Sequence, residues 1–206
     1  MFQIQVEEAL VVLCALAGAA HVLAPDHWLP GSIIAWQRGW TFKRTALFAL
    51  IALSAHVLAG FLIFWTIESF IIQLPSDMLF VVALLLMTSV MIVRALRFSR
   101  IREVLSAGPR SSWQLWAVLS LLGPCESVIP IFAKSAQLGV GYIVPFAAFL
   151  GGTLVAGLPA IISGRRRCDN PFWLPQGVSL ARRKMAAVPA LASVALGIAF
   201  LLNLSH

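Results

Sequence analysis

Hydrophobic residues gather into six long runs that are separated by short polar segments. The runs cover about residues 8–36, 45–73, 78–97, 113–137, 142–163 and 186–204. A helix needs about 20 residues to cross a hydrocarbon core of roughly 30 Å. The pattern therefore predicts an all-α integral membrane protein, in which residues 1–206 form a single transmembrane domain of six spanning helices.

Proline residues interrupt two of these runs at matching places. They are Pro25 and Pro30 in the first run, and Pro124 and Pro130 in the fourth. Because proline removes a backbone donor and clashes with the preceding turn, we expect transmembrane helices 1 and 4 to be broken there. Each break also carries an acid, and three spans per half make the two halves enter the membrane in opposite senses. This layout is typical of transporters built as an inverted three-plus-three repeat, here with half-repeats at about 1–100 and 111–206.

The charged residues indicate the orientation of the chain. Only 11% of the residues are charged, whereas soluble domains average about 25%. Fourteen of the fifteen basic residues follow the first, third and fifth runs, and Lys134 is the exception. The positive-inside rule places those three loops in the cytoplasm, including a long one at about 164–184, and both termini outside. We therefore expect a multi-pass protein of the cytoplasmic membrane that contacts lipids and binds no nucleic acid.

Polar side chains in three of the runs are predicted to lie at similar depths. From the helical rise, His21 lies roughly 20 Å from the outer face, and His56 and Cys125 lie about 16 Å and about 18 Å from the cytoplasmic face. Ionisable groups at such depths are costly and persist mainly where they face a cavity, a partner or a cargo. The candidates for one shared site are His21, Asp26, His27, His56, Cys125 and Glu126.

The chemistry of these side chains favours a metal site. Borderline first-row metals prefer imidazole and carboxylate ligands, whereas Mg²⁺ and Ca²⁺ prefer oxygen ligands alone. Ligand type leaves nickel, cobalt and zinc all open. Other roles are open too, because His56 could hydrogen-bond a neighbouring helix and Asp26 could cap a restarted one. Cys125 could supply a thiolate or simply fill space.

Two short motifs carry a family resemblance. The His-x4-Asp-His pattern at residues 21–27 resembles the signature of the nickel/cobalt transporter superfamily. The Leu-Gly-Pro-Cys-Glu-Ser stretch at 122–127 is similar to a conserved region of its shorter efflux-type and urease-accessory-like permeases, and His56 is similar to a histidine in their next helix. The chain departs from the high-affinity members, which have eight spans and an arginine where Ala20 stands here. The resemblance implies that nickel or cobalt is carried by a site at the motif residues.

The combined expectation is a secondary transporter that moves a divalent transition-metal cation across the cytoplasmic membrane. We expect no enzymatic activity and no tightly bound cofactor, because the ion is cargo. Assembly into a homo-oligomer is compatible with this architecture. Two alternatives remain, namely a membrane thiol–disulfide electron carrier that uses Cys14 and Cys125, and a non-transporting accessory membrane subunit.

Overall fold

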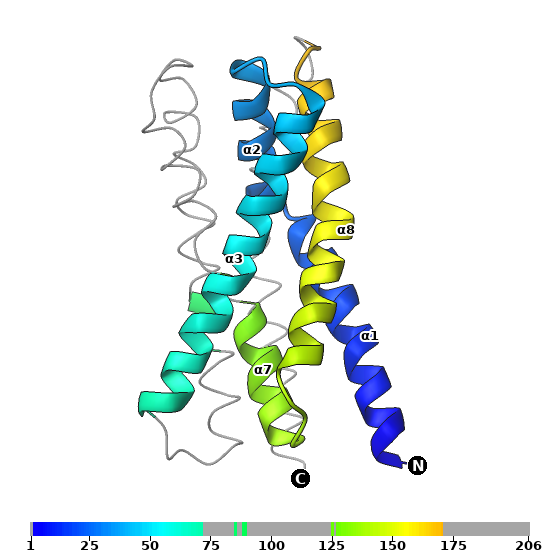
Figure 1. The fold of residues 1–206 in the computed structure, drawn as a ribbon, viewed down its shortest axis with the longest axis vertical. Helices are drawn as coiled ribbons and strands as arrows, with labels where there is room; N and C mark the ends of the chain where they lie inside the picture. The colour runs from blue at the N-terminus through cyan, green and yellow to red at the C-terminus, as the bar shows by residue number, and fades with distance from the viewer. Residues whose placement is uncertain (1, 72–84, 86–87, 90–124, 126, 171–206) are drawn as a thin grey trace.

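The computed structural model describes residues 2–71, 85, 88, 89, 125 and 127–170 (Figure 1). Within these ranges the chain is helical and contains no strand. The helices with defined bounds are α1 (Phe2–Val22), α2 (Pro25–Gln37), α3 (Phe42–Ile71), α7 (Val128–Gln137) and α8 (Ile143–Arg167). The predicted sixth span, and all but three residues of the third, lie outside the described residues.

The described helices include elements that are long and apolar enough to cross a bilayer. Two of them qualify on their own, α3 over Phe42–Ser69 and α8 over Ile143–Arg167. A third crossing results if α1 and α2 count as one bent span. The described residues therefore confirm the helical prediction and include two or three helices that could span a membrane, whereas the number of six spans stays a prediction.

The first predicted span is broken between α1 and α2. Helix α1 ends at Val22, Pro25 occupies the first turn of α2, and the two axes differ in direction by 53°. The indole N–H of Trp28 donates to the carbonyl oxygen of Leu23 at 3.1 Å. This bond satisfies a carbonyl that the end of α1 would otherwise leave without a helical partner. Pro30, by contrast, lies within α2 and does not end it.

Helix α8 packs against α1, α2, α3 and α7, and its contact with α1 is the most extensive. Glycine makes this contact close. A Cβ atom added to Gly18 would collide with the carbonyl oxygen of Phe149, and one added to Gly152 would collide with the carbonyl oxygen of Ala15. The two helices therefore touch backbone to backbone around these positions. Gly151, the neighbour of Gly152, has no such contact.

Two helix–turn–helix units have the same turn and run in opposite directions. Figure 1 shows α2 rising to a turn from which α3 descends, and α7 descending to a turn from which α8 rises. Each turn contains a glycine with positive φ, 59° at Gly39 and 67° at Gly139. In both turns the following amide reaches back to a carbonyl five residues earlier, Trp40 to Ala35 and Val140 to Ser135, each at 2.9 Å.

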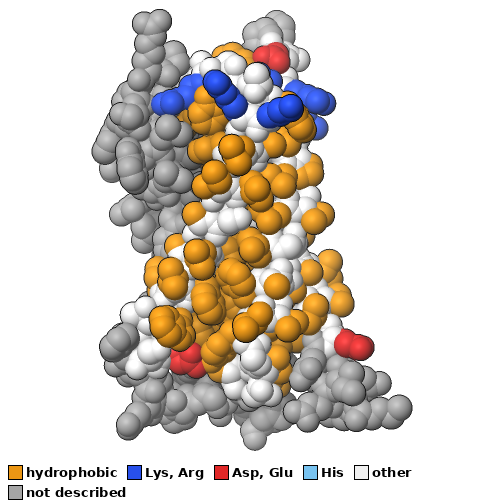
Figure 2. Space-filling view, in the orientation of Figure 1, with side chains coloured by type: hydrophobic (Ala, Val, Ile, Leu, Met, Phe, Trp, Pro, Cys, Tyr) orange, Lys and Arg blue, Asp and Glu red, His pale blue; other side chains and the backbone are white. Residues whose placement is uncertain are grey.

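Charge is distributed unevenly between the two ends of the bundle. Figure 2 shows Lys and Arg side chains at the end where α2 and α8 finish and α3 begins. The residues are Arg38, Lys43, Arg44, Arg165, Arg166 and Arg167. Helix α8 continues through Arg167. The loop predicted to start at 164 therefore starts later, since arginine is a good helix former and the three arginines extend α8.

An aromatic cluster occupies the opposite end of the bundle, between α3, α7 and α8. Phe64 and Phe132 are fully buried, with ring centroids 5.5 Å apart. Tyr142 stacks edge-on against both rings, and its hydroxyl donates a hydrogen bond to Glu68. This packing fixes α7 against the end of α3.

Replacing Gly152 with alanine tests the close contact of α1 and α8. The new methyl group would force the helices apart, and overpacking of this kind costs about 1–3 kcal/mol. We expect a lower unfolding temperature for the purified protein in detergent. Gly151→Ala is the matched control, because a Cβ at that position meets nothing within 4 Å. Equal losses in the two variants would contradict the proposed packing.

Candidate metal site

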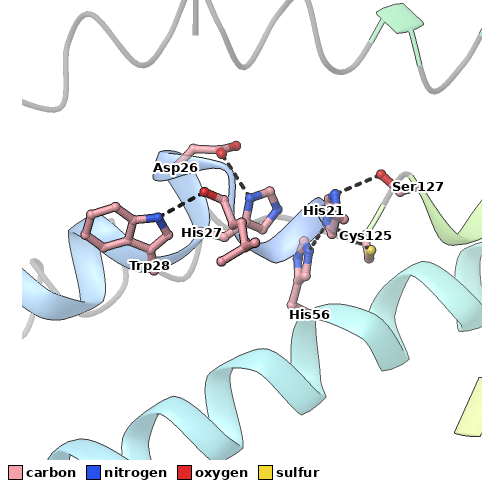
Figure 3. Close-up of polar contacts among 8 residues, drawn as sticks. His21, Asp26, His27, Trp28, His56, Cys125 and Ser127 are labelled. Carbon is pink, nitrogen blue, oxygen red and sulfur yellow. Dashed lines mark hydrogen bonds and ion pairs between the residues drawn. The ribbon is translucent and has the colours of Figure 1, made fainter. Parts of the chain in front are cut away.

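Three donor atoms from separate parts of the chain meet beside the break between α1 and α2. They belong to His21, His56 and Cys125, and each lies within 4.8 Å of the others. His21 Nε2 lies 3.2 Å from His56 Nε2 and 3.3 Å from Cys125 Sγ. His56 and Cys125 are buried, and His21 is partly buried. Figure 3 shows the two imidazoles and the sulfur converging. We refer to these three residues as the donor group.

Local backbone structure explains how each donor reaches the group. His21 lies in the last turn of α1, one residue before that helix ends, and His56 lies midway along α3. Cys125 is attached to α3 through its backbone, because its amide donates to the carbonyl oxygen of His56 at 3.1 Å. A Cβ on Gly60 would collide with the carbonyl oxygen of Cys125. Glycine at this position therefore allows the Cys125 peptide to lie directly on α3.

A serine orients the first imidazole. Ser127 Oγ lies 2.9 Å from His21 Nδ1, on the side of the ring away from the donor group. When Nδ1 carries the proton and donates it to this hydroxyl, Nε2 presents its lone pair to the group. A hydrogen bond to the distal ring nitrogen commonly fixes the tautomer and orientation of a metal-binding histidine. Ser127 was not singled out in the sequence, although it follows two candidate residues directly.

The second motif histidine is paired with the motif carboxylate. His27 Nδ1 lies 2.9 Å from Asp26 Oδ1, and both residues are buried at the start of α2. The His27 ring lies beside the donor group, with its centroid 4.1 Å from that of His21 and 5.0 Å from that of His56. The structure therefore gathers the three described imidazoles and places the Asp26 carboxylate behind one of them.

The donor group has dimensions suited to a small four-coordinate ion. With Zn–N about 2.0–2.1 Å and Zn–S about 2.3 Å, tetrahedral donors lie roughly 3.3–3.6 Å apart. The separations of His21 Nε2 from His56 Nε2 and Cys125 Sγ, 3.2 Å and 3.3 Å, are within a few tenths of an ångström of those values. All three donor atoms lie within 4.8 Å of one another, so a single ion could reach each of them.

The sequence predicted six site residues, and the structure places five of them in two adjacent groups. His21, His56 and Cys125 form the donor group, whereas Asp26 and His27 pair beside it. Glu126 lies outside the described residues. The helical rise predicted similar depths for His56 and Cys125. Their direct contact, however, depends on the backbone hydrogen bond between them.

All three cysteines are buried and unbonded to one another. Cys14 packs in the hydrophobic core that also includes Cys125. Cys168, beyond the end of α8, has a pKa raised to about 11, mainly by burial and further by the Asp169 carboxylate, while Arg165 acts in the opposite direction. Its thiol therefore stays protonated at neutral pH, because the reactive thiolate forms only as the pH approaches that raised value.

No family model, curated protein or solved structure matches this chain. The resemblance to nickel/cobalt transporters therefore rests on the two motifs alone and stays a prediction.

Replacing Ser127 with alanine tests the orientation of His21. The variant loses the hydroxyl that lies 2.9 Å from His21 Nδ1, and losses of this kind weaken metal binding by about 10–100-fold. Titration of the purified protein with Co²⁺ measures the change. Ser135→Ala is the control, because Ser135 also lies in α7 but its hydroxyl donates to the carbonyl oxygen of Ile131 in the same helix. Unchanged affinity in Ser127→Ala would contradict the assigned role.

Proposed function

We propose that this chain is a membrane transporter for a divalent transition-metal cation, which it holds at the donor group. The observation that carries the proposal is the meeting of two imidazole nitrogens and one thiol sulfur, from three separate elements, within 4.8 Å of one another. Polar groups buried inside a membrane protein are costly and usually serve function. If these three side chains served only structure, one hydrogen-bond partner for each would be enough.

The position of the group supports a role in transport. It lies at a break in an apolar bent helix pair, well away from the basic end of the bundle. Transporters commonly bind cargo where helices are interrupted near the middle of the membrane. By the positive-inside rule the basic end faces the cytoplasm. We propose the cytoplasmic membrane as the location, with both termini outside.

The two oppositely directed units support an alternating movement. The α2–α3 and α7–α8 units share the turn hydrogen bonds described above, and α2 and α7 each follow the segment that carries donor residues. Inverted units of this kind can rock against each other and expose one site to either face in turn. We propose that they belong to the two halves of a six-span inverted repeat.

The donor atoms limit which metal ions the site would bind. Nitrogen and sulfur donors disfavour Mg²⁺ and Ca²⁺, which need shells of oxygen. The motif resemblance favours nickel or cobalt, and zinc has the same ligand chemistry. Asp26 contributes negative charge behind His27, which offsets part of the charge of the incoming cation.

Flux of metal ions into proteoliposomes tests the function. A fluorescent indicator inside the vesicles reports entry of Co²⁺, Ni²⁺ or Zn²⁺. We expect His21→Ala to reduce the flux to that of protein-free vesicles, because it removes the donor shared by both short contacts. Asp26→Asn should reduce it as well, since it removes the negative charge behind His27 that offsets part of the charge of the cation. Wild-type flux in both variants would refute the proposed site.

The same preparation separates the proposal from the two alternatives. Cys14→Ser should transport metal normally, whereas a thiol–disulfide carrier that depends on Cys14 would lose electron transfer in this variant. An accessory subunit would show neither metal flux nor saturable binding of metal to the purified protein. Ser135→Ala again controls for general effects of removing a buried hydroxyl.

A further inference from the structure

We propose that the donor group selects a thiophilic cation of tetrahedral preference, of the Zn²⁺ type, ahead of Ni²⁺. This inference rests on the proposed function and concerns the class of ion that the same site accepts. It departs from the motif resemblance, which points to nickel or cobalt, and follows instead from the atoms that the structure gathers.

The first argument is the identity of the donors. Among the described residues the group consists of two nitrogens and one sulfur, and no carboxylate belongs to it. The nearby Asp26 carboxylate is directed to His27 Nδ1. Ni²⁺ with nitrogen and oxygen ligands prefers square-planar, tetragonal or octahedral shells, whereas mixed nitrogen and sulfur sets in tetrahedral arrangement are typical of zinc.

The second argument is the placement of the sulfur. Cys125 is fully buried, and its peptide is held on α3 by the His56 carbonyl on one side and the close approach of Gly60 on the other. The anchored backbone fixes the direction of the Cα–Cβ bond, and Sγ lies 3.3 Å from His21 Nε2. A cysteine that served only as a small hydrophobic residue, like Cys14 in the same core, would need no such anchoring.

The third argument is the number of donors. Zinc sites that exchange a ligand hold the ion with three protein groups and leave the fourth position open. Within the part of the chain that the structure describes, the donor group has three members. At a fourth position the ion could keep a water molecule or another ligand as it enters the site, and exchange it as it leaves. A transported ion needs such an exchange.

Cobalt spectroscopy tests this inference. We would use the full-length variant Cys14→Ser/Cys168→Ser, so that Cys125 is the only cysteine, and titrate it with Co²⁺. We expect intense visible bands of tetrahedral Co²⁺ and a near-ultraviolet sulfur-to-cobalt charge-transfer band. Zn²⁺ should displace Co²⁺ at a concentration at least about tenfold lower than Ni²⁺ does.

Replacing the remaining cysteine provides the decisive comparison. Cys125→Ser in the same background should lose the charge-transfer band, and the advantage of Zn²⁺ over Ni²⁺ should fall to within about threefold. If the spectrum of the Cys14→Ser/Cys168→Ser protein is pale and octahedral, or lacks the sulfur band, the inference is overturned without need of Cys125→Ser. An unchanged order of displacement in Cys125→Ser overturns it as well.

The outcomes distinguish this inference from the proposed function. Suppose that the protein binds Co²⁺ without a sulfur band, and that His21→Ala abolishes this binding. The metal site then stands, whereas the proposed selectivity through the thiolate fails. If the protein binds none of Co²⁺, Ni²⁺ and Zn²⁺, the proposed function itself fails. If the sulfur band is present and Zn²⁺ displaces Co²⁺ first, both stand.

Discussion

The arrangement of the described helices depends on finding partners for polar groups buried in an apolar bundle. A buried donor or acceptor that lacks a partner costs about 1–3 kcal/mol, and His27, His56 and Cys125 are all buried. The protein meets this constraint locally. His21 is placed against Ser127, His56 and Cys125, while His27 is placed against Asp26. The break between α1 and α2 is stabilised in the same way, by the indole of Trp28. These partners come from different helices, so they also specify how the helices fit together.

Glycine provides the close packing that this network requires. The α1–α8 contact around Gly18 and Gly152 positions the end of α1, and therefore His21. Gly60 allows the Cys125 peptide to reach α3. The polar site and the apolar packing are thus built by the same helix contacts, and a change in one alters the other.

Much of this could be predicted from the sequence, because hydropathy and proline placement are local signals. The apolar runs predicted the bounds of α3 to within a few residues, and Pro25 predicted the break. Pro30, the sixth residue of α2, does not end the helix, although a proline there removes the backbone donor that would bond four residues earlier. The site was predicted in part. Depth along a helix indicated that His21, His56 and Cys125 share a layer, but which of them touch depends on tertiary contacts, such as the Cys125–His56 backbone bond. The pairing of Asp26 with His27 rather than with the other donors is likewise a matter of rotamers.

The backbone bond between Cys125 and His56 has a mechanical consequence. Two of the three donors are coupled through α3, whereas His21 stands on a helix that ends beside a 53° bend. Straightening or tightening that bend would move the His21 imidazole relative to His56 and Cys125. An ion could then lose one ligand without the unwinding of any helix. The two residues between Val22 and Pro25 would then act as the hinge that controls release of the ion.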